Sequence, residues 1–177
     1  MLQRLHSFDY WRGSQPLVHI GRPTGGANYW RGPSFIYAAS LQAPPAKLST
    51  QARDVQLNAL AARFNNGYLR IYTGAQPATP NTAASGTLLA ELRFPSPAFA
   101  TVSGGGPLVA NPIIEDASGD ATGTPGWYRC LESDGTTPIL DGTVGTAGAN
   151  LNFSSLSFEV GIPVRVSAYT HTLPMAA

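Results

Sequence analysis

Cysteine is almost absent from this chain, with Cys130 alone among 177 residues. A single cysteine excludes a disulfide bond within the chain and any metal site built from several cysteines. Cys130 alternates with Arg129 and Leu131 in a run typical of a strand, so we interpret it as a small buried residue rather than a reactive thiol. The fold must therefore be stable without covalent cross-links.

Charge is also scarce, because charged residues make up only 12% of the chain, about half the share typical of globular proteins. The formal net charge of +1 gives no overall attraction to nucleic acid or to anionic membranes. Basic residues nevertheless outnumber acids within residues 1–47, and acids outnumber basic residues beyond them. This asymmetry indicates either an ordinary solvated surface or a basic segment that docks onto an acidic neighbour.

Long apolar runs are absent as well. No stretch approaches the roughly 18 apolar residues of a membrane span. The first residues, MLQRLHSFDYWRG, lack the apolar run of a signal peptide. We therefore expect no membrane partner, and a protein that is made and assembled in a cytoplasm.

Residues 1–48 show neither helical nor strand periodicity and are interrupted by proline and glycine, which predicts an extended N-terminal arm without its own core. The sequence Tyr-Trp-Arg-Gly occurs twice in this arm, at residues 10–13 and 29–32. Such large side chains are buried either on the chain's own body or against another subunit, because their exposure to water is unfavourable. Since Trp, Tyr and Arg often dominate binding at protein interfaces, we predict these interface anchors: Tyr10, Trp11, Arg12, Tyr29, Trp30, Arg31, Phe35 and Tyr37.

A change of pattern near residue 49 predicts the only long helix, over residues 50–65. Ser49 or Thr50 can cap its start, and Asn65-Asn66-Gly67 supplies a left-handed stop. The apolar residues recur at intervals of three and four positions and predict one buried stripe, formed by Ala52, Val55, Leu60, Ala61 and Phe64.

Beyond residue 67 the pattern predicts strands throughout. Short apolar runs are separated by clusters of Gly, Pro, Asn and Asp, and Asp134-Gly135 is the best hairpin signal. The predicted strands cover residues 68–72, 87–94, 108–114, 126–132, 137–140, 155–160 and 163–173. We therefore expect residues 49–177 to form a mainly-β domain, an antiparallel β-sandwich or jelly roll of about seven or eight strands with one short helix.

Candidate catalytic groups are few and scattered. His6 and His19 lie in the arm, His171 lies near the C-terminus, and no Gly-x-Ser-x-Gly motif accompanies them. Aromatic and Arg pairs in the arm could stack on single-stranded nucleic acid, but the arm has few basic groups for that role. We therefore expect no enzymatic activity, no cofactor and no nucleic-acid partner.

Two loops contain residue types that occur in ligand-binding sites. Asp116, Ser118, Asp120 and Thr122 place oxygen atoms at every second position, which could suit a cation such as calcium. The alternative, which we favour, is a turn at residues 118–120 in which Asp116 and Asp120 accept hydrogen bonds from loop amides.

The glycines at 104–106 lack the Lys-Ser/Thr of a phosphate-binding loop, so we interpret them as a connection between strands.

An ordered series of short motifs resembles a family of small virion proteins of tailed phages and prophages. The series begins with the helix that ends in Asn-Asn-Gly. It continues through residues 68–74, 76–79, 88–92, 116–123, 127–129, 141–145 and 150–152, and ends in a final strand of alternating Val, Ser and Thr. The resemblance covers residues 50–174, whereas the shorter members of the family begin near the helix.

This resemblance implies a non-enzymatic virion protein that decorates or cements a capsid. The alternatives are a component of the neck, tail or fibre base, and a carbohydrate-binding adsorption module that would use Trp127 and Tyr128. The implied partners are the major capsid protein or other virion subunits, together with further copies of this chain, with a trimer as the first expectation.

Overall fold

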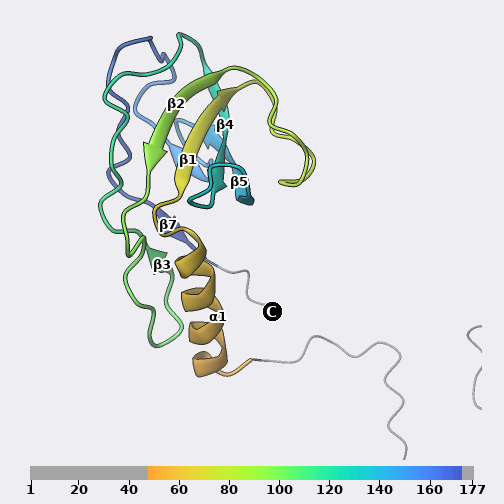
Figure 1. Ribbon diagram of the computed structural model, residues 1–177, viewed down its shortest axis with the longest axis vertical. Coiled ribbons are helices and arrows are strands. Elements are labelled where there is room, and N and C mark those ends of the chain that lie inside the picture. Colours follow the sequence, from red (N-terminus) through yellow and green to blue (C-terminus); the bar gives the residue numbers. More distant parts are fainter. Residues whose placement is uncertain (1–47, 173–177) are drawn as a thin grey trace, which may run out of the picture. The chain divides into compact units, whose positions relative to one another are not determined.

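The computed structural model describes residues 48–172, which are mainly strand with one helix (Figure 1). The helix is α1 (Thr50–Arg63), and within residues 48–172 no helix is long and apolar enough to cross a membrane. The strands are β1 (Tyr68–Thr73), β2 (Leu88–Arg93), β3 (Leu108–Val109), β4 (Pro125–Leu131), β5 (Pro138–Gly145), β6 (Leu151–Asn152) and β7 (Thr170–His171). The prediction of a mainly-β domain with one short helix is confirmed at this level.

The helix begins at the predicted residue and ends at Arg63, two residues before the predicted end. The Ser49 Oγ accepts a hydrogen bond from the Ala52 N–H at 3.2 Å. Asn66 has a positive φ of 56°, a left-handed conformation that asparagine tolerates better than most residues. Local side-chain chemistry therefore fixes both ends of α1.

The buried stripe of α1 differs in part from the predicted one. Ala61 and Phe64 are buried as expected, but Leu57 is the third core residue and Val55 is 69% exposed. Residues 57, 61 and 64 share one helical face because they are spaced by four and three positions. Asn58 adds a polar attachment, since its side chain exchanges hydrogen bonds of 2.9 and 3.0 Å with the Val102 backbone.

The main sheet has the strand order β2-β1-β4-β5-β6 and is curled (Figure 1). Its neighbours pair antiparallel except β5 and β6, which run in parallel. The sheet is therefore mixed, and the expectation of a purely antiparallel arrangement is wrong at this edge.

The predicted hairpin at Asp134-Gly135 is confirmed as the turn between β4 and β5. Gly135 has a φ of +68°, and the Asp134 carboxylate accepts hydrogen bonds from the Thr136 and Thr137 N–H groups at 2.8 Å. The Thr137 hydroxyl donates a third at 2.6 Å. The Thr137 hydroxyl and these amides hold the pKa of Asp134 well below its ordinary value, because they bind the charged form.

Outside the main sheet the pairing is short. β3 pairs with β7, and single bridges join Arg93 to Ile114, residue 116 to 164, and residue 123 to 158. The runs predicted as strands at 108–114, 155–160 and 163–173 therefore yield two-residue strands and isolated bridges. β6 was not predicted as a strand. Ile114 pairs with the end of β2, and the segments at 155–160 and 163–171 pair with residues 108–123 rather than with β2, so few of their backbone groups form a regular ladder.

One face of the main sheet forms the core. Leu69 and Ile71 of β1 and Tyr128 and Cys130 of β4 alternate onto this face and are buried. A cluster of aromatic rings lies against them, with centroids of contacting pairs 5.1 to 6.1 Å apart. Its members come from three separate stretches of chain and are Phe64, Phe94, Phe99 and Tyr169.

Candidate functional site

The arm residues predicted as interface anchors lie outside the described residues. They are Tyr10, Trp11, Arg12, Tyr29, Trp30, Arg31, Phe35 and Tyr37. His6 and His19 lie there too. The interface role of the arm therefore stays a prediction.

Within residues 48–172, no group of three or more His, Cys, Asp or Glu side chains could hold a metal ion. His171 pairs with Leu108 between β7 and β3 and is partly buried. This burial lowers the pKa of His171 and so favours the neutral imidazole.

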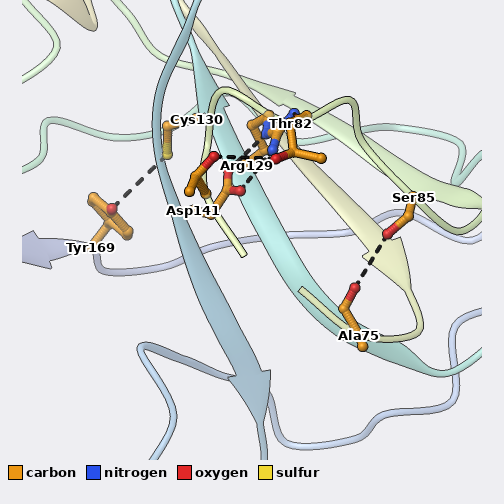
Figure 2. A network of polar contacts seen from close by, with 8 residues as sticks. Ala75, Thr82, Ser85, Arg129, Cys130, Asp141 and Tyr169 are labelled. Carbon is orange, nitrogen blue, oxygen red and sulfur yellow. Dashed lines mark hydrogen bonds and ion pairs between the residues drawn. The ribbon is translucent and has the colours of Figure 1, made fainter. Parts of the chain in front are cut away.

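Cys130 lies in the core, as predicted. Its side chain is fully buried and its Sγ atom is 3.9 Å from the Tyr169 hydroxyl (Figure 2). Burial raises the pKa of the Cys130 thiol, so the reactive thiolate is disfavoured. The Tyr169 hydroxyl also lies 3.2 Å from that of Tyr128, whose pKa burial raises to about 12.

Asp116 fastens a loop to the edge of β2. Its Oδ2 accepts a hydrogen bond from the Glu91 N–H and its Oδ1 accepts one from the Ser118 N–H, both at 3.0 Å. The Asp120 N–H donates to the Leu89 carbonyl at 2.8 Å, and burial, followed by the nearby Asp116, raises the pKa of the Asp120 carboxyl. The interpretation of Asp116 as an acceptor for loop amides is confirmed, but for Asp120 it is wrong, because the Asp120 carboxylate accepts no hydrogen bond from residues 48–172.

The glycine loop at 104–106 binds a carboxylate of its own chain. The N–H groups of Gly104 and Gly105 donate to the two Asp54 oxygens at 2.9 Å each, with φ values of +76° and +77° at the glycines. The loop thus anchors the N-terminal half of α1. Sequence reasoning missed Asp54, because nothing in the sequence brings positions separated by 50 residues together.

On the other face of the main sheet, Arg129 of β4 and Asp141 of β5 form a buried ion pair (Figure 2). Arg129 donates to both Asp141 oxygens at 2.7 Å and to the Thr82 carbonyl at 2.8 Å. The guanidinium also lies 5.2 Å from the ring centroid of Trp127, which stacks on Tyr72. The loop between β1 and β2 is therefore held down over the sheet.

This arrangement leaves β4 buried on both faces. Trp127 is 0% exposed and Tyr128 is 3% exposed. The carbohydrate-binding alternative relied on these two aromatic side chains at the surface, so it loses the feature that suggested it.

A surface groove, which we name the edge groove, lies between residues 110–115 and 165–169 and has a volume of about 540 Å³. The two walls join at both ends, where the Ala110 N–H donates to the Tyr169 carbonyl at 2.9 Å and Asp116 bridges to Val164. They run side by side at the edge of the sheet in Figure 1, as a green and a dark blue trace. Between the two ends they separate, so they enclose the groove and form no ladder.

One wall of the edge groove has the pattern of a strand without a partner strand. Val164, Val166 and Tyr169 are buried, whereas the intervening residues 165, 167 and 168 are exposed. No backbone N–H or C=O group of residues 165–168 forms a hydrogen bond with another residue between 48 and 172. Over the described part of the chain, these groups are left to solvent or to a binding partner.

The opposite wall presents apolar surface. Ile114 pairs with Arg93 at the edge of β2 through hydrogen bonds of 2.8 and 3.1 Å, while 56% of its own surface is exposed. Glu115 pairs with Arg165 across the groove, with the Arg165 Nη2 3.3 Å from the Glu115 Oε1. Other large apolar side chains, Val109, Val160 and Ile162, are exposed in the segments that lead into and out of these walls.

A second cavity of about 430 Å³ adjoins the edge groove, because Val164 and Arg165 line both. Its apolar lining includes Phe153, Phe158 and Ile162. The segment at residues 162–166 therefore separates two surface cavities.

No family model, curated protein or solved structure matches this chain.

Proposed function

We propose that this chain is a non-enzymatic structural subunit of a phage virion, a capsid decoration or cement protein that binds neighbouring subunits through its body and its N-terminal arm. The observation that carries the proposal is the edge groove, where backbone groups without partners lie beside exposed apolar side chains. Extended segments bind such edges through main-chain hydrogen bonds, and exposed apolar patches mark protein contacts.

The exposed edge favours a binding role because natural proteins usually cover or charge such edges to prevent unwanted pairing. Here the neighbouring side chains include Ile114 at 56% and Ile162 at 55% exposure. We propose that the β3–β7 sheet and the main sheet act as two layers of an irregular sandwich, with this edge directed at a neighbour.

The proposed partners are the major capsid protein or other virion subunits, together with further copies of this chain. The protein would assemble in the host cytoplasm and remain in the virion. A symmetric oligomer, with a trimer as the first expectation, would repeat each weak contact and so increase the overall affinity.

Purified particles made from the genome that encodes this chain test the proposal. We expect the protein in the particles at a copy number comparable to that of the major capsid protein. We also expect particles without it to assemble but to rupture at lower temperature or under milder osmotic shock. A copy number that fits a single ring would favour the alternative of a neck or tail protein. The absence of the protein from particles would refute a virion role.

Point variants link the result to the exposed surface. Ile162→Asp should reduce incorporation into particles, because it places a charge on an apolar contact surface. Val55→Asp is the matched control, since Val55 is 69% exposed on α1 and lines none of these cavities. Equal incorporation of the two variants would argue against the edge as the binding surface.

A further inference from the structure

We infer that the edge groove receives residues 34–38 of a second copy of this chain, added as an extended strand along residues 165–168. The inference rests on the proposed function and deepens it by naming the partner. It concerns the same groove and the same arm, but it commits to exchange between identical subunits.

The groove has the length of a short strand. Its walls are joined at the 110–169 and 116–164 positions, so residues 111–115 form the open part of one wall. Residues 34–38 match this stretch residue for residue, and an added strand advances about 3.3 Å per residue, as the wall does. The segment contains no proline, so each of its N–H groups can donate to a ladder.

The side chains of the segment suit the groove. Phe35, Ile36 and Tyr37 are strongly strand-forming, and alternation would direct Ile36 to one side and the two aromatic rings to the other. The apolar lining of the groove comes from Ile113, Ile114 and Val166. Residues 34–38 carry no charge, so their burial leaves no unpaired ion.

The charge distribution favours binding between copies. Residues 1–47 have an excess of basic residues and the remainder of the chain has an excess of acids. Opposite charge on two parts of one chain attracts the arm of one copy to the body of another. A contact in which each copy donates one arm and accepts one is head-to-tail, and it closes into a ring when the rotation permits.

Cross-linking between two different full-length chains tests this contact. One chain carries Ile36→Cys and an affinity tag, the other carries Ser167→Cys without a tag, and both are co-expressed and treated with a short thiol-to-thiol reagent. A bond between the engineered thiols can then join only separate chains. The native Cys130 gives little background because it is fully buried.

The expected result is a cross-linked pair of tagged and untagged chains. Thr146→Cys replaces Ser167→Cys in the matched control, because Thr146 is exposed between β5 and β6, away from the groove. Adding Ile114→Asp to the acceptor chain should lower the yield about tenfold, whereas Val55→Asp should leave it unchanged.

Two outcomes would overturn the inference. One is a yield with Ser167→Cys that does not exceed the yield with Thr146→Cys. The other is found by placing Ile36→Cys and Ser167→Cys in one chain: a product that is cross-linked only within monomers would assign the groove to the chain's own arm.

The same preparations separate this inference from the proposed function. Particles that contain the protein in quantity, without any cross-link between copies, would leave the virion role standing and remove the arm exchange. A cross-link between copies of a protein that is absent from particles would do the opposite.

Discussion

Removal of the Asp141 carboxylate tests whether the covered face of the main sheet depends on its buried ion pair. The Asp141 side chain is 0% exposed and that of Arg129 is 6% exposed. In Asp141→Ala, Arg129 retains only the Thr82 carbonyl among its hydrogen-bond partners in residues 48–172. Because this variant leaves a buried charge without its counter-ion, we expect it to lower the free energy of unfolding by about 3–5 kcal/mol.

Glu115→Ala is the matched control, because it removes a carboxylate from an exposed pair. Its partner Arg165 is 74% exposed, so the loss should be no more than about 1 kcal/mol. Replacing both buried partners, as Arg129→Met with Asp141→Leu, should recover most of the stability lost in the single variant, since no unpaired charge remains.

Urea unfolding followed by far-ultraviolet circular dichroism measures these differences, and amide hydrogen exchange locates them. Exchange should accelerate first in the loop between β1 and β2, because Arg129 holds the Thr82 carbonyl. A loss in Asp141→Ala no larger than that in Glu115→Ala would refute the reasoning. So would a double variant that is as unstable as Asp141→Ala.

Three further predictions concern single sites. Asp54→Ala should lower the free energy of unfolding by about 1–3 kcal/mol and speed amide exchange at Gly104 and Gly105, because their N–H groups lose the carboxylate acceptor. Unchanged exchange at these two amides would contradict this prediction. Gly142→Ala should cost about 1–3 kcal/mol because its Cβ would meet the Tyr128 ring, whereas Gly106→Ala, with open space around it, should be near neutral in thermal unfolding. Tyr128 has a pKa of about 12 in the fold against an ordinary 10.0, so the fold favours its protonated form. The stability that this raised pKa contributes is complete below about pH 10 and is lost as the pH rises toward 12. Tyr128→Phe should therefore reduce the pH dependence of the free energy of unfolding in that range.

Local features of the fold were predictable because short-range chemistry decides them. Ser49 caps α1 and Asp134-Gly135 forms the hairpin turn through bonds within a few residues, and Asn66 stops the helical region through its own left-handed backbone conformation. Strong strand patterns gave β1, β2 and β4 nearly to the residue. The weaker patterns at residues 108–114 and after residue 145 gave the wrong extents, since short pairings and isolated bridges hold those segments. The strand predicted over residues 137–140 is also longer in the structure, where β5 reaches Gly145.

The candidate site was less predictable. The run at residues 163–173 has the alternation of a strand, but alternation does not reveal whether a partner strand lies beside it. The bonds of Asp54 to Gly104, of Asp116 to Glu91 and of Arg129 to Thr82 were also hidden, because each joins segments far apart in the chain. The arm anchors at residues 10–12, 29–31, 35 and 37 remain predictions from composition alone.

The sequence by itself determined the mainly-β class, the single helix with its caps, the hairpin turn and the burial of its only cysteine. These follow from side-chain chemistry and periodicity that act over a few residues. Only the tertiary structure decided that β5 and β6 run in parallel, that an ion pair fastens the covered face, and that residues 165–168 line an open groove. These features depend on how segments pack and pair in the folded core. Even β5 with β6, and Arg129 with Asp141, which are close in the chain, pair in a direction and register that no local pattern sets.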